Sequence, residues 1–280
     1  MYPPKFDYHR ASSLDEAFSL MSQTGGKVLA GGHSMIPTLK LRLADPGALI
    51  DIGRISDLNG ISVSGGSIHI GALTTHATVA ASSNLPAALT EAAGWIGDPQ
   101  VRNRGTVGGN VAHADPASDL PTVFVALGAT VHVQGPNGSR SIPAENFFID
   151  LFMTDLRDDE LVTSVEVPQD GTSTAYAKLF NPASRYAIVG AAVKIDISGN
   201  SFNTARVAIG GLTPNAVRSK SVEDALVNEP VSDATIEAAA AKVTADLVDV
   251  MGDIHASEEY RRAMAPVFVE RAIKSAVERS

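Results

Sequence analysis

A chain of 280 residues with 44% hydrophobic residues exceeds one average domain, so we expect two globular domains. The absence of cysteine excludes disulfides, thiolate catalysis and iron–sulfur sites within the chain, so any redox chemistry needs an organic cofactor. The net charge of −9 and the scattered Lys and Arg argue against nucleic acid as a partner, and the 7 His form no metal-binding motif.

Two absences bear on location. No apolar run approaches the roughly 20 residues of a transmembrane helix. The first five residues, Met-Tyr-Pro-Pro-Lys, lack the basic-then-apolar pattern of a signal peptide. We therefore expect a cytoplasmic protein with no transmembrane segment.

The first half of the chain mixes helical and strand patterns. Ser13 to Glu16 forms a capping box ahead of an amphipathic helix, which Gly25-Gly26 ends. Runs on either side of Gly65-Gly66 and of residues 135–138 predict two β-hairpins. Further helices are expected at 75–81, 86–96 and 115–126, and further strands at 27–30, 48–52 and 161–167.

A polar stretch at 169–174 is the best candidate for a linker between domains. After it, the expected strands are 175–180, 187–197 and 203–210, and the expected helices are 221–227, 233–248 and 257–277. Strands followed by a block of helices indicate an α+β fold rather than a βαβ winding.

Two glycine segments are the main candidates for a ligand site: Ala30-Gly31-Gly32-His33-Ser34, directly after a predicted strand, and Thr106-Val107-Gly108-Gly109-Asn110. A bound diphosphate needs several backbone N–H donors, and small residues let it approach them. Neither segment has the Rossmann or P-loop spacing. Either could be an ordinary tight turn, but the polar residues 98–104 before the second segment favour a functional loop.

Four segments taken together resemble a known family. Residues 30–34, 97–110, 116–121 and 181–190 are similar, in order and spacing, to the FAD-binding medium subunit of molybdenum hydroxylases, the xanthine oxidase family. The likeness is strongest to the aerobic carbon monoxide dehydrogenase type. It implies an FAD-binding domain of the vanillyl-alcohol-oxidase (PCMH) type at 1–170, with subdomains of about 1–55 and 56–170. A smaller α+β flavoprotein domain would follow at 175–280.

The resemblance also implies which residues hold the cofactor. Two segments would wrap the FAD diphosphate from opposite sides: Val28, Leu29, Ala30, Gly31, Gly32, His33, Ser34 and Met35 from one, and Thr106, Val107, Gly108, Gly109 and Asn110 from the other. No catalytic residue and no metal ligand is expected in this chain. For His33, a role in solvent or behind the ligand is an equal alternative to direct contact.

Five single residues complete the implied site. Ile96 stands where relatives place an aromatic near the adenine, Asp119 would accept hydrogen bonds from the ribose or adenine, and Val162 would pack on the cofactor. Lys178 would lie at the polar edge of the flavin, and Tyr186 against the isoalloxazine. The alternatives are that Asp119 caps the next helix, that Lys178 is solvated, and that Tyr186 is an ordinary core aromatic. Trp95, the only Trp, is expected in the core.

The function implied by the resemblance is electron transfer within a heterotrimer. A large subunit would carry the molybdenum cofactor and oxidise the substrate, and a small subunit would carry [2Fe-2S] clusters. The present chain would accept electrons on FAD and pass them to an external acceptor, in a complex expected as a dimer of heterotrimers that can associate with the inner face of the membrane. The alternatives are a complex acting on an aldehyde, a purine or an N-heterocycle, a stand-alone flavin reductase, and a non-redox scaffold.

Overall fold

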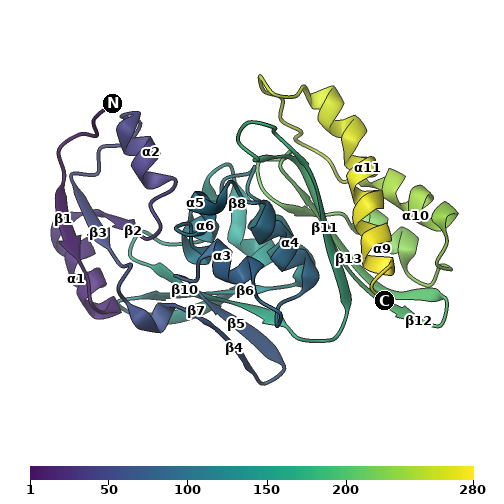
Figure 1. The fold of residues 1–280 in the computed structure, drawn as a ribbon, viewed down its shortest axis with the longest axis horizontal. Coiled ribbons are helices and arrows are strands. Elements are labelled where there is room, and N and C mark those ends of the chain that lie inside the picture. The colour runs from purple at the N-terminus through teal and green to yellow at the C-terminus, as the bar shows by residue number, and fades with distance from the viewer.

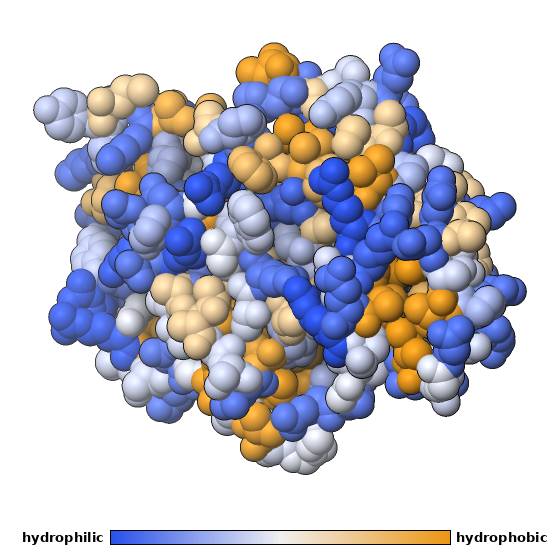
Figure 2. Space-filling model, turned by 45° about the vertical axis from the view of Figure 1, so that its right-hand side comes forward, coloured by the Kyte–Doolittle hydropathy of each residue, from blue (hydrophilic) through white to orange (hydrophobic).

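The computed structural model describes residues 1–280 and divides the chain into three packed units, arranged from left to right in Figure 1. Each unit has its own sheet and its own hydrophobic core. No helix is both long enough and apolar enough to cross a membrane. On the face seen in Figure 2, hydrophobic residues show as separate patches between hydrophilic ones.

The N-terminal unit is a parallel three-stranded sheet in the order β1-β3-β2. Its strands are β1 (Asp7–Arg10), β2 (Lys27–Leu29) and β3 (Ala48–Asp51), and its helices are α1 (Leu14–Thr24) and α2 (Met35–Lys40). This local β-α-β-α-β connection is an exception to the expected absence of βαβ winding. Neither β1 nor α2 was predicted, since both are too short to show a periodic pattern.

Helix α1 begins where its sequence predicts. The Ser13 hydroxyl accepts a hydrogen bond from the Glu16 amide at 3.1 Å. The Glu16 carboxylate accepts one from the Ser12 amide at 2.7 Å, one residue earlier than in a standard capping box. Gly25 ends the helix in the left-handed conformation, with φ of 63°.

The middle unit is a five-stranded antiparallel sheet in the order β4-β5-β10-β6-β7. The two predicted hairpins are present. The strands of the unit, with the small β8-β9 hairpin, are β4 (Ile61–Ser64), β5 (Ser67–Gly71), β6 (Thr130–Gly135), β7 (Gly138–Pro143), β8 (Phe148–Asp150), β9 (Met153–Thr154) and β10 (Leu161–Pro168). Its helices are η1 (Ser56–Leu58), α3 (His76–Ala80), α4 (Ala87–Trp95), α5 (Pro99–Arg102), α6 (Val107–His113), α7 (Asp119–Leu127) and α8 (Ala144–Phe147).

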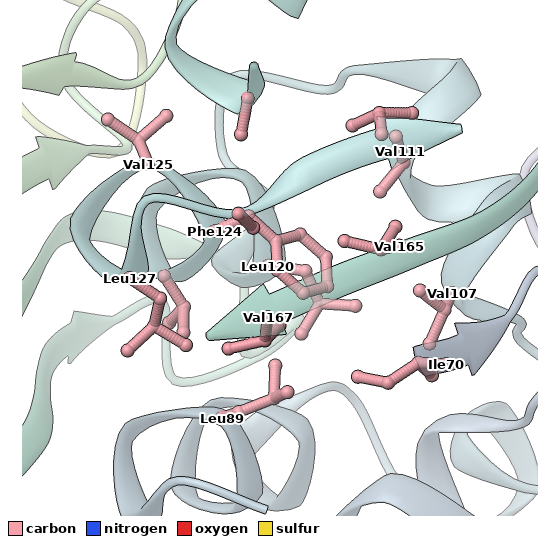
Figure 3. Packing of buried hydrophobic residues seen from close by; sticks show 14 of the residues in the cluster. Ile70, Leu89, Val107, Val111, Leu120, Phe124, Val125, Leu127, Val165 and Val167 are labelled. Atoms are coloured by element: carbon pink, nitrogen blue, oxygen red, sulfur yellow. The ribbon is translucent and has the colours of Figure 1, made fainter. Parts of the chain in front are cut away.

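The core of this unit forms around Phe124 of α7. Figure 3 shows its ring between Leu120 of the same helix and the strand that carries Val165 and Val167. Val107 of α6 also points into this core and is fully buried. Because α7 is buried along its whole length, it supports both the middle sheet and the unit that follows.

The C-terminal unit is an antiparallel sheet in the order β11-β12-β13-β14. Its strands are β11 (Ser173–Phe180), β12 (Ala187–Ser198), β13 (Ser201–Gly210) and β14 (Val217–Arg218). Its helices are α9 (Lys220–Leu226), α10 (Asp233–Ala240), η2 (Ala241–Ala245) and α11 (Glu258–Val277). The single helix predicted at 233–248 was wrong in extent, because the α-helix ends at Ala240 and one 3₁₀ segment follows.

Helix α7 packs against the face of the C-terminal sheet that α11 leaves uncovered. This close approach needs glycine at Gly210 of β13, because a Cβ there would overlap the Thr122 hydroxyl of α7. Arg206 of β13 donates to the carbonyl oxygens of Val125 and Ala126 at 3.0 and 3.1 Å. The C-terminal unit thereby supplies donors to carbonyls in the last turn of α7, where the Val125 carbonyl also accepts from the Gly128 amide at 3.2 Å.

Candidate functional site

A cavity of about 1100 Å³ lies between the N-terminal and middle units and extends to residues 184–186 of the C-terminal unit. It exceeds the roughly 300–1,000 Å³ of most small-molecule sites, so it suits a long ligand. The predicted site residues line this cavity, with the exceptions of Leu29, Val107 and Lys178. The structure therefore brings together two segments that are some seventy residues apart in the sequence.

The first glycine segment presents unused backbone donors. The amides of residues 31–35 donate a hydrogen bond to no group of the protein. Each of the two positions requires glycine for a different structural reason. A Cβ at Gly31 would overlap the carbonyl oxygen of Arg104, and Gly32 adopts a φ of 80°. A run of free N–H groups beside a cavity is a candidate site for an anion, because successive backbone donors present partial positive charge to the same space.

The second glycine segment is not the loop that its composition suggested. It begins helix α6, with Thr106 as the N-cap, whose hydroxyl accepts from the Gly109 amide at 3.2 Å. The amides of Val107 and Gly108 donate to carbonyls of the middle unit at 2.9 and 2.8 Å. A Cβ at Gly108 would come within 2.5 Å of the Ala72 Cβ. Gly108 is therefore explained by helix packing, and these backbone donors are already occupied.

Side chains are what the second segment offers to the cavity. The side-chain Oδ1 of Asn110 accepts from the Ser118 hydroxyl at 2.7 Å, which leaves the side-chain NH₂ group of Asn110 free to donate. Thr106 and Gly109 also line the cavity. A Cβ at Gly109 would be 3.8 Å from the Ala30 Cβ, so the two glycine segments face one another closely.

Asp119 is held by two side chains of the C-terminal unit. Its carboxylate accepts from the Lys178 ammonium at 2.9 Å and from the Tyr176 hydroxyl at 2.6 Å. Burial raises the pKa of Asp119 and lowers that of Lys178, and the ion pair opposes both shifts. Asp119 does not cap α7, since Ser118 is the N-cap.

Lys178 differs from expectation. Its side chain is only 1% exposed and does not line the cavity, so it is neither solvated nor at the cavity wall. Its ammonium also donates to the Trp95 carbonyl at 3.3 Å, next to Ile96. Lys178 therefore lies behind the end of the cavity wall that Ile96 and Asp119 form, although the sequence expectation placed Ile96 and Asp119 near the adenine and Lys178 near the flavin.

Aromatic side chains are exposed at this same end. Tyr186 is 48% exposed and lines the cavity, so it is not a core residue. Partial burial, with the carboxylates of Asp115 and Asp119, raises the pKa of Tyr186. Trp95 was predicted in the core and is instead exposed, stacked on Phe180 with ring centroids 5.5 Å apart.

His76, the first residue of α3, was missed by sequence reasoning. It is buried, lines the cavity, and its Nδ1 has no hydrogen-bond partner. Burial, with a smaller contribution from the nearby His33, lowers the pKa of His76 to about 4, so the ring is neutral near pH 7. A buried polar atom without a partner inside a cavity indicates a place where a ligand atom binds.

Three cations of the cavity were also missed. The cavity is lined by Lys27 of β2, by Arg157, which precedes β10, and by Arg185, which follows β11. No local pattern could have found them, because the cavity forms only when the three units pack together. They give the site positive charges that suit a dianionic diphosphate.

Comparisons with known proteins agree with this geometry. Residues 4–170 match the family described as the FAD binding domain in molybdopterin dehydrogenase. Residues 174–276 match the CO dehydrogenase flavoprotein C-terminal domain. The chain belongs to the FAD-binding medium subunits of the molybdenum hydroxylases. The resemblance noted in the sequence and the α+β class of both domains are thereby confirmed.

Full-length relatives of this medium-subunit family are similar over the whole chain. The carbon monoxide dehydrogenase medium chain of Hydrogenophaga pseudoflava is 39% identical, covering 99% of this chain and 98% of that one. The glyceraldehyde dehydrogenase medium chain of Sulfolobus acidocaldarius is also 39% identical, covering 98% and 99%. These relatives are oxidoreductase subunits, so the chain is an oxidoreductase component.

Solved structures give the same result. A carbon monoxide dehydrogenase from Hydrogenophaga pseudoflava superposes with a TM-score of 0.95 at 40% identity, covering 100% of this chain and 99% of that one. Quinoline 2-oxidoreductase from Pseudomonas putida 86 gives 0.94 at 30% identity, covering 99% of both chains. The fold is therefore shared by medium subunits whose complexes are named for different substrates.

Proposed function

We propose that the cavity binds FAD with its diphosphate on the free amides of residues 31–35. These donors carry the proposal, because no protein group uses them and their residues line the cavity together with Gly109 and the Asn110 side chain. The cations Lys27 and Arg157, which also line the cavity, are available to balance the phosphate charge. The occupied amides of α6 imply that residues 106–110 contribute side chains and close contact rather than a second set of backbone donors.

The isoalloxazine is assigned to the end with Tyr186 and Ile96. Tyr186 offers an aromatic face there, and Ile96 an apolar contact. The adenine is assigned to the opposite side, near Val162 and Leu161 of β10, where Leu161 packs into the core of the N-terminal unit. The sequence expectation placed Ile96 near the adenine. Ile96 is assigned to the flavin end instead, because Lys178 links the carbonyl of its neighbour Trp95 to Asp119.

The buried ion pair has a positioning role in this arrangement. Asp119 belongs to the FAD-binding residues 1–170, and Lys178 to the C-terminal residues 175–280. Their contact at 2.9 Å fixes the C-terminal unit, and so Tyr186, against the flavin end. Bound FAD supplies the redox chemistry, exchanging one or two electrons. The chain binds it, orients it, and leaves the half-exposed Tyr186 end open to a partner.

We infer that the chain is the electron-transfer subunit of a heterotrimeric molybdenum hydroxylase. Its relatives are named medium chains, and a chain without cysteine cannot itself hold an iron–sulfur cluster. Electrons would arrive from [2Fe-2S] clusters in a small subunit, after oxidation of the substrate at the molybdenum cofactor of a large subunit. FAD in this chain would then deliver them to an external acceptor.

In this scheme the large subunit determines which substrate the complex oxidises. Relatives named for carbon monoxide and for glyceraldehyde are equally identical to this chain, at 39%. Carbon monoxide remains the first substrate to test, because residues 174–276 match the CO dehydrogenase flavoprotein C-terminal domain and a carbon monoxide dehydrogenase superposes over the whole chain. Aldehydes and N-heterocycles are the second set.

The test is an anaerobic reduction of the complex, purified with its native partner subunits. Adding the electron-donating substrate, carbon monoxide first, should reduce the flavin and bleach its absorbance, and the isolated chain with FAD should show no change with the same substrate. FAD extracted from the complex should be equimolar with this chain. A complex that contains all three subunits but no extractable flavin would refute the proposal.

A further inference from the structure

A second polar cluster lies on the middle sheet, outside the cavity. His69 of β5, His132 of β6 and Glu166 of β10 place one ligand-type atom each within 4.8 Å of one another. The His132 Nε2 is 3.0 Å from the Glu166 carboxylate, and the His69 Nδ1 is 4.0 Å from the same oxygen. None of the three lines the cavity. Figure 1 shows β5, β10 and β6 as neighbours in one sheet.

Strand alternation brings these residues to one face. Glu166 pairs directly with His69 across β10 and β5. Their sequence neighbours, such as Ile68, Ile70 and Val165, point to the opposite face and are buried in the core. Packing therefore explains the apolar positions of these strands, but it does not call for two imidazoles and a carboxylate side by side.

A neighbouring hydroxyl orients one imidazole of the cluster. Ser141 of β7 is 2.8 Å from the Nδ1 of His132, so the other ring nitrogen of that residue faces Glu166. A second partner that orients the imidazole is typical of a metal ligand.

We propose that His69, His132 and Glu166 form a binding site for one divalent transition-metal ion, best suited to Zn²⁺. Two imidazoles and a carboxylate are common zinc ligands, with bonds of about 2.0–2.2 Å. Ligand atoms around a tetrahedral ion are then about 3.4 Å apart, which lies between the 3.0 and 4.0 Å separations of the two imidazole nitrogens from the Glu166 oxygen. The three side chains are 35%, 28% and 31% exposed, which leaves a fourth position for water.

An ion bound at this site would connect three neighbouring strands, β5, β10 and β6, at their solvent-exposed face. It would stabilise the sheet that carries Val162 to the cavity, without contact with the cofactor. Because the ion binds only the folded chain, its affinity appears directly as a rise in melting temperature.

The experiment uses the full chain loaded with FAD and dialysed against EDTA. Titration with ZnCl₂ by calorimetry should show one equivalent bound, and zinc at a hundredfold excess over Kd should raise Tm by about 5 °C. His132→Gln and Glu166→Gln should each weaken zinc binding at least 100-fold. His255→Gln, on an exposed residue outside the cluster, is the matched control and should bind as the unsubstituted chain does.

Two results would overturn the proposal. One is less than 0.2 equivalents of zinc on the unsubstituted chain, which would make the cluster a hydrogen-bonded surface triad. The other is unchanged affinity in both cluster variants, which would place the ion elsewhere. The measurement on the unsubstituted chain decides the first result even if a variant fails to fold, and FAD content reports whether each variant is intact.

Discussion

Substitution of Gly31 by alanine is the sharpest test of the diphosphate site. A Cβ at this position would overlap the Arg104 carbonyl oxygen and lie 2.9 Å from the Gly105 Cα, so backbone has to move. Overpacking of this kind costs about 1–3 kcal/mol of folding free energy. The first glycine segment would shift away from α6, and its free amides would no longer converge on the cavity.

The loss of affinity follows from the hydrogen bonds at stake. Each bond to a charged group contributes about 1.5–3 kcal/mol, so misplacing two of the amides costs about 3–6 kcal/mol. At 1.4 kcal/mol per tenfold change, FAD should bind Gly31→Ala at least 100-fold more weakly. Titration of the apoprotein with FAD, followed by flavin fluorescence, measures this directly.

Gly94→Ala is the matched control. Gly94 lies on an exposed position of α4, has no neighbour within 4 Å of a built Cβ, and does not line the cavity. Alanine there should keep FAD affinity and stabilise the helix by up to about 1 kcal/mol. If Gly31→Ala binds FAD within threefold of the unsubstituted chain and melts at the same temperature, the assignment of the diphosphate to this segment is incorrect.

Three further predictions concern buried groups. The pKa of His76 is about 4 in the folded chain and about 6.5 in the unfolded chain, so protonation favours the unfolded chain. The stability attributable to His76 should therefore rise by about 3 kcal/mol from pH 4 to pH 6.5 and stay constant above pH 6.5. The difference in unfolding free energy between the unsubstituted chain and His76→Gln, measured across that range in urea, should follow this rise; a constant difference would count against it. Lys178→Met should destabilise the folded chain by about 3–5 kcal/mol, because it leaves the Asp119 carboxylate buried without its cation. In a melting scan, the double variant with Asp119→Leu should recover much of this loss. Equal melting temperatures of the single and double variants would contradict the ion-pair argument. Gly210→Ala should lower stability by about 1–3 kcal/mol, because the added methyl group would overlap the Thr122 hydroxyl. Adding Thr122→Ala should restore the stability, since a Cβ at position 210 is 3.4 Å from the Thr122 Cβ. Purely additive effects of the two substitutions would show that the two residues do not clash.

Local patterns located most of the regular elements. Helix α1, both hairpins and the long helix α11 lie where capping residues, paired glycines and apolar periodicity predict them. The short elements β1, α2 and α6 escaped prediction because so few residues show too little of a period, whereas the equally short strands of the two hairpins were found from the turns between them. Composition misled at the second glycine segment, where Gly108 serves helix packing against Ala72.

The candidate site divides in the same way. The sequence by itself determined the family, the two glycine segments and the absence of an iron–sulfur site, because these depend on residue types and on their order along the chain. Only the tertiary structure decided that the free donors belong to residues 31–35, that Lys178 pairs with Asp119 rather than facing the cavity, and that His76 is buried there without a partner. Each of these depends on contacts between units far apart in the sequence, and hydrogen bonding and burial are set by those contacts rather than by local residue type.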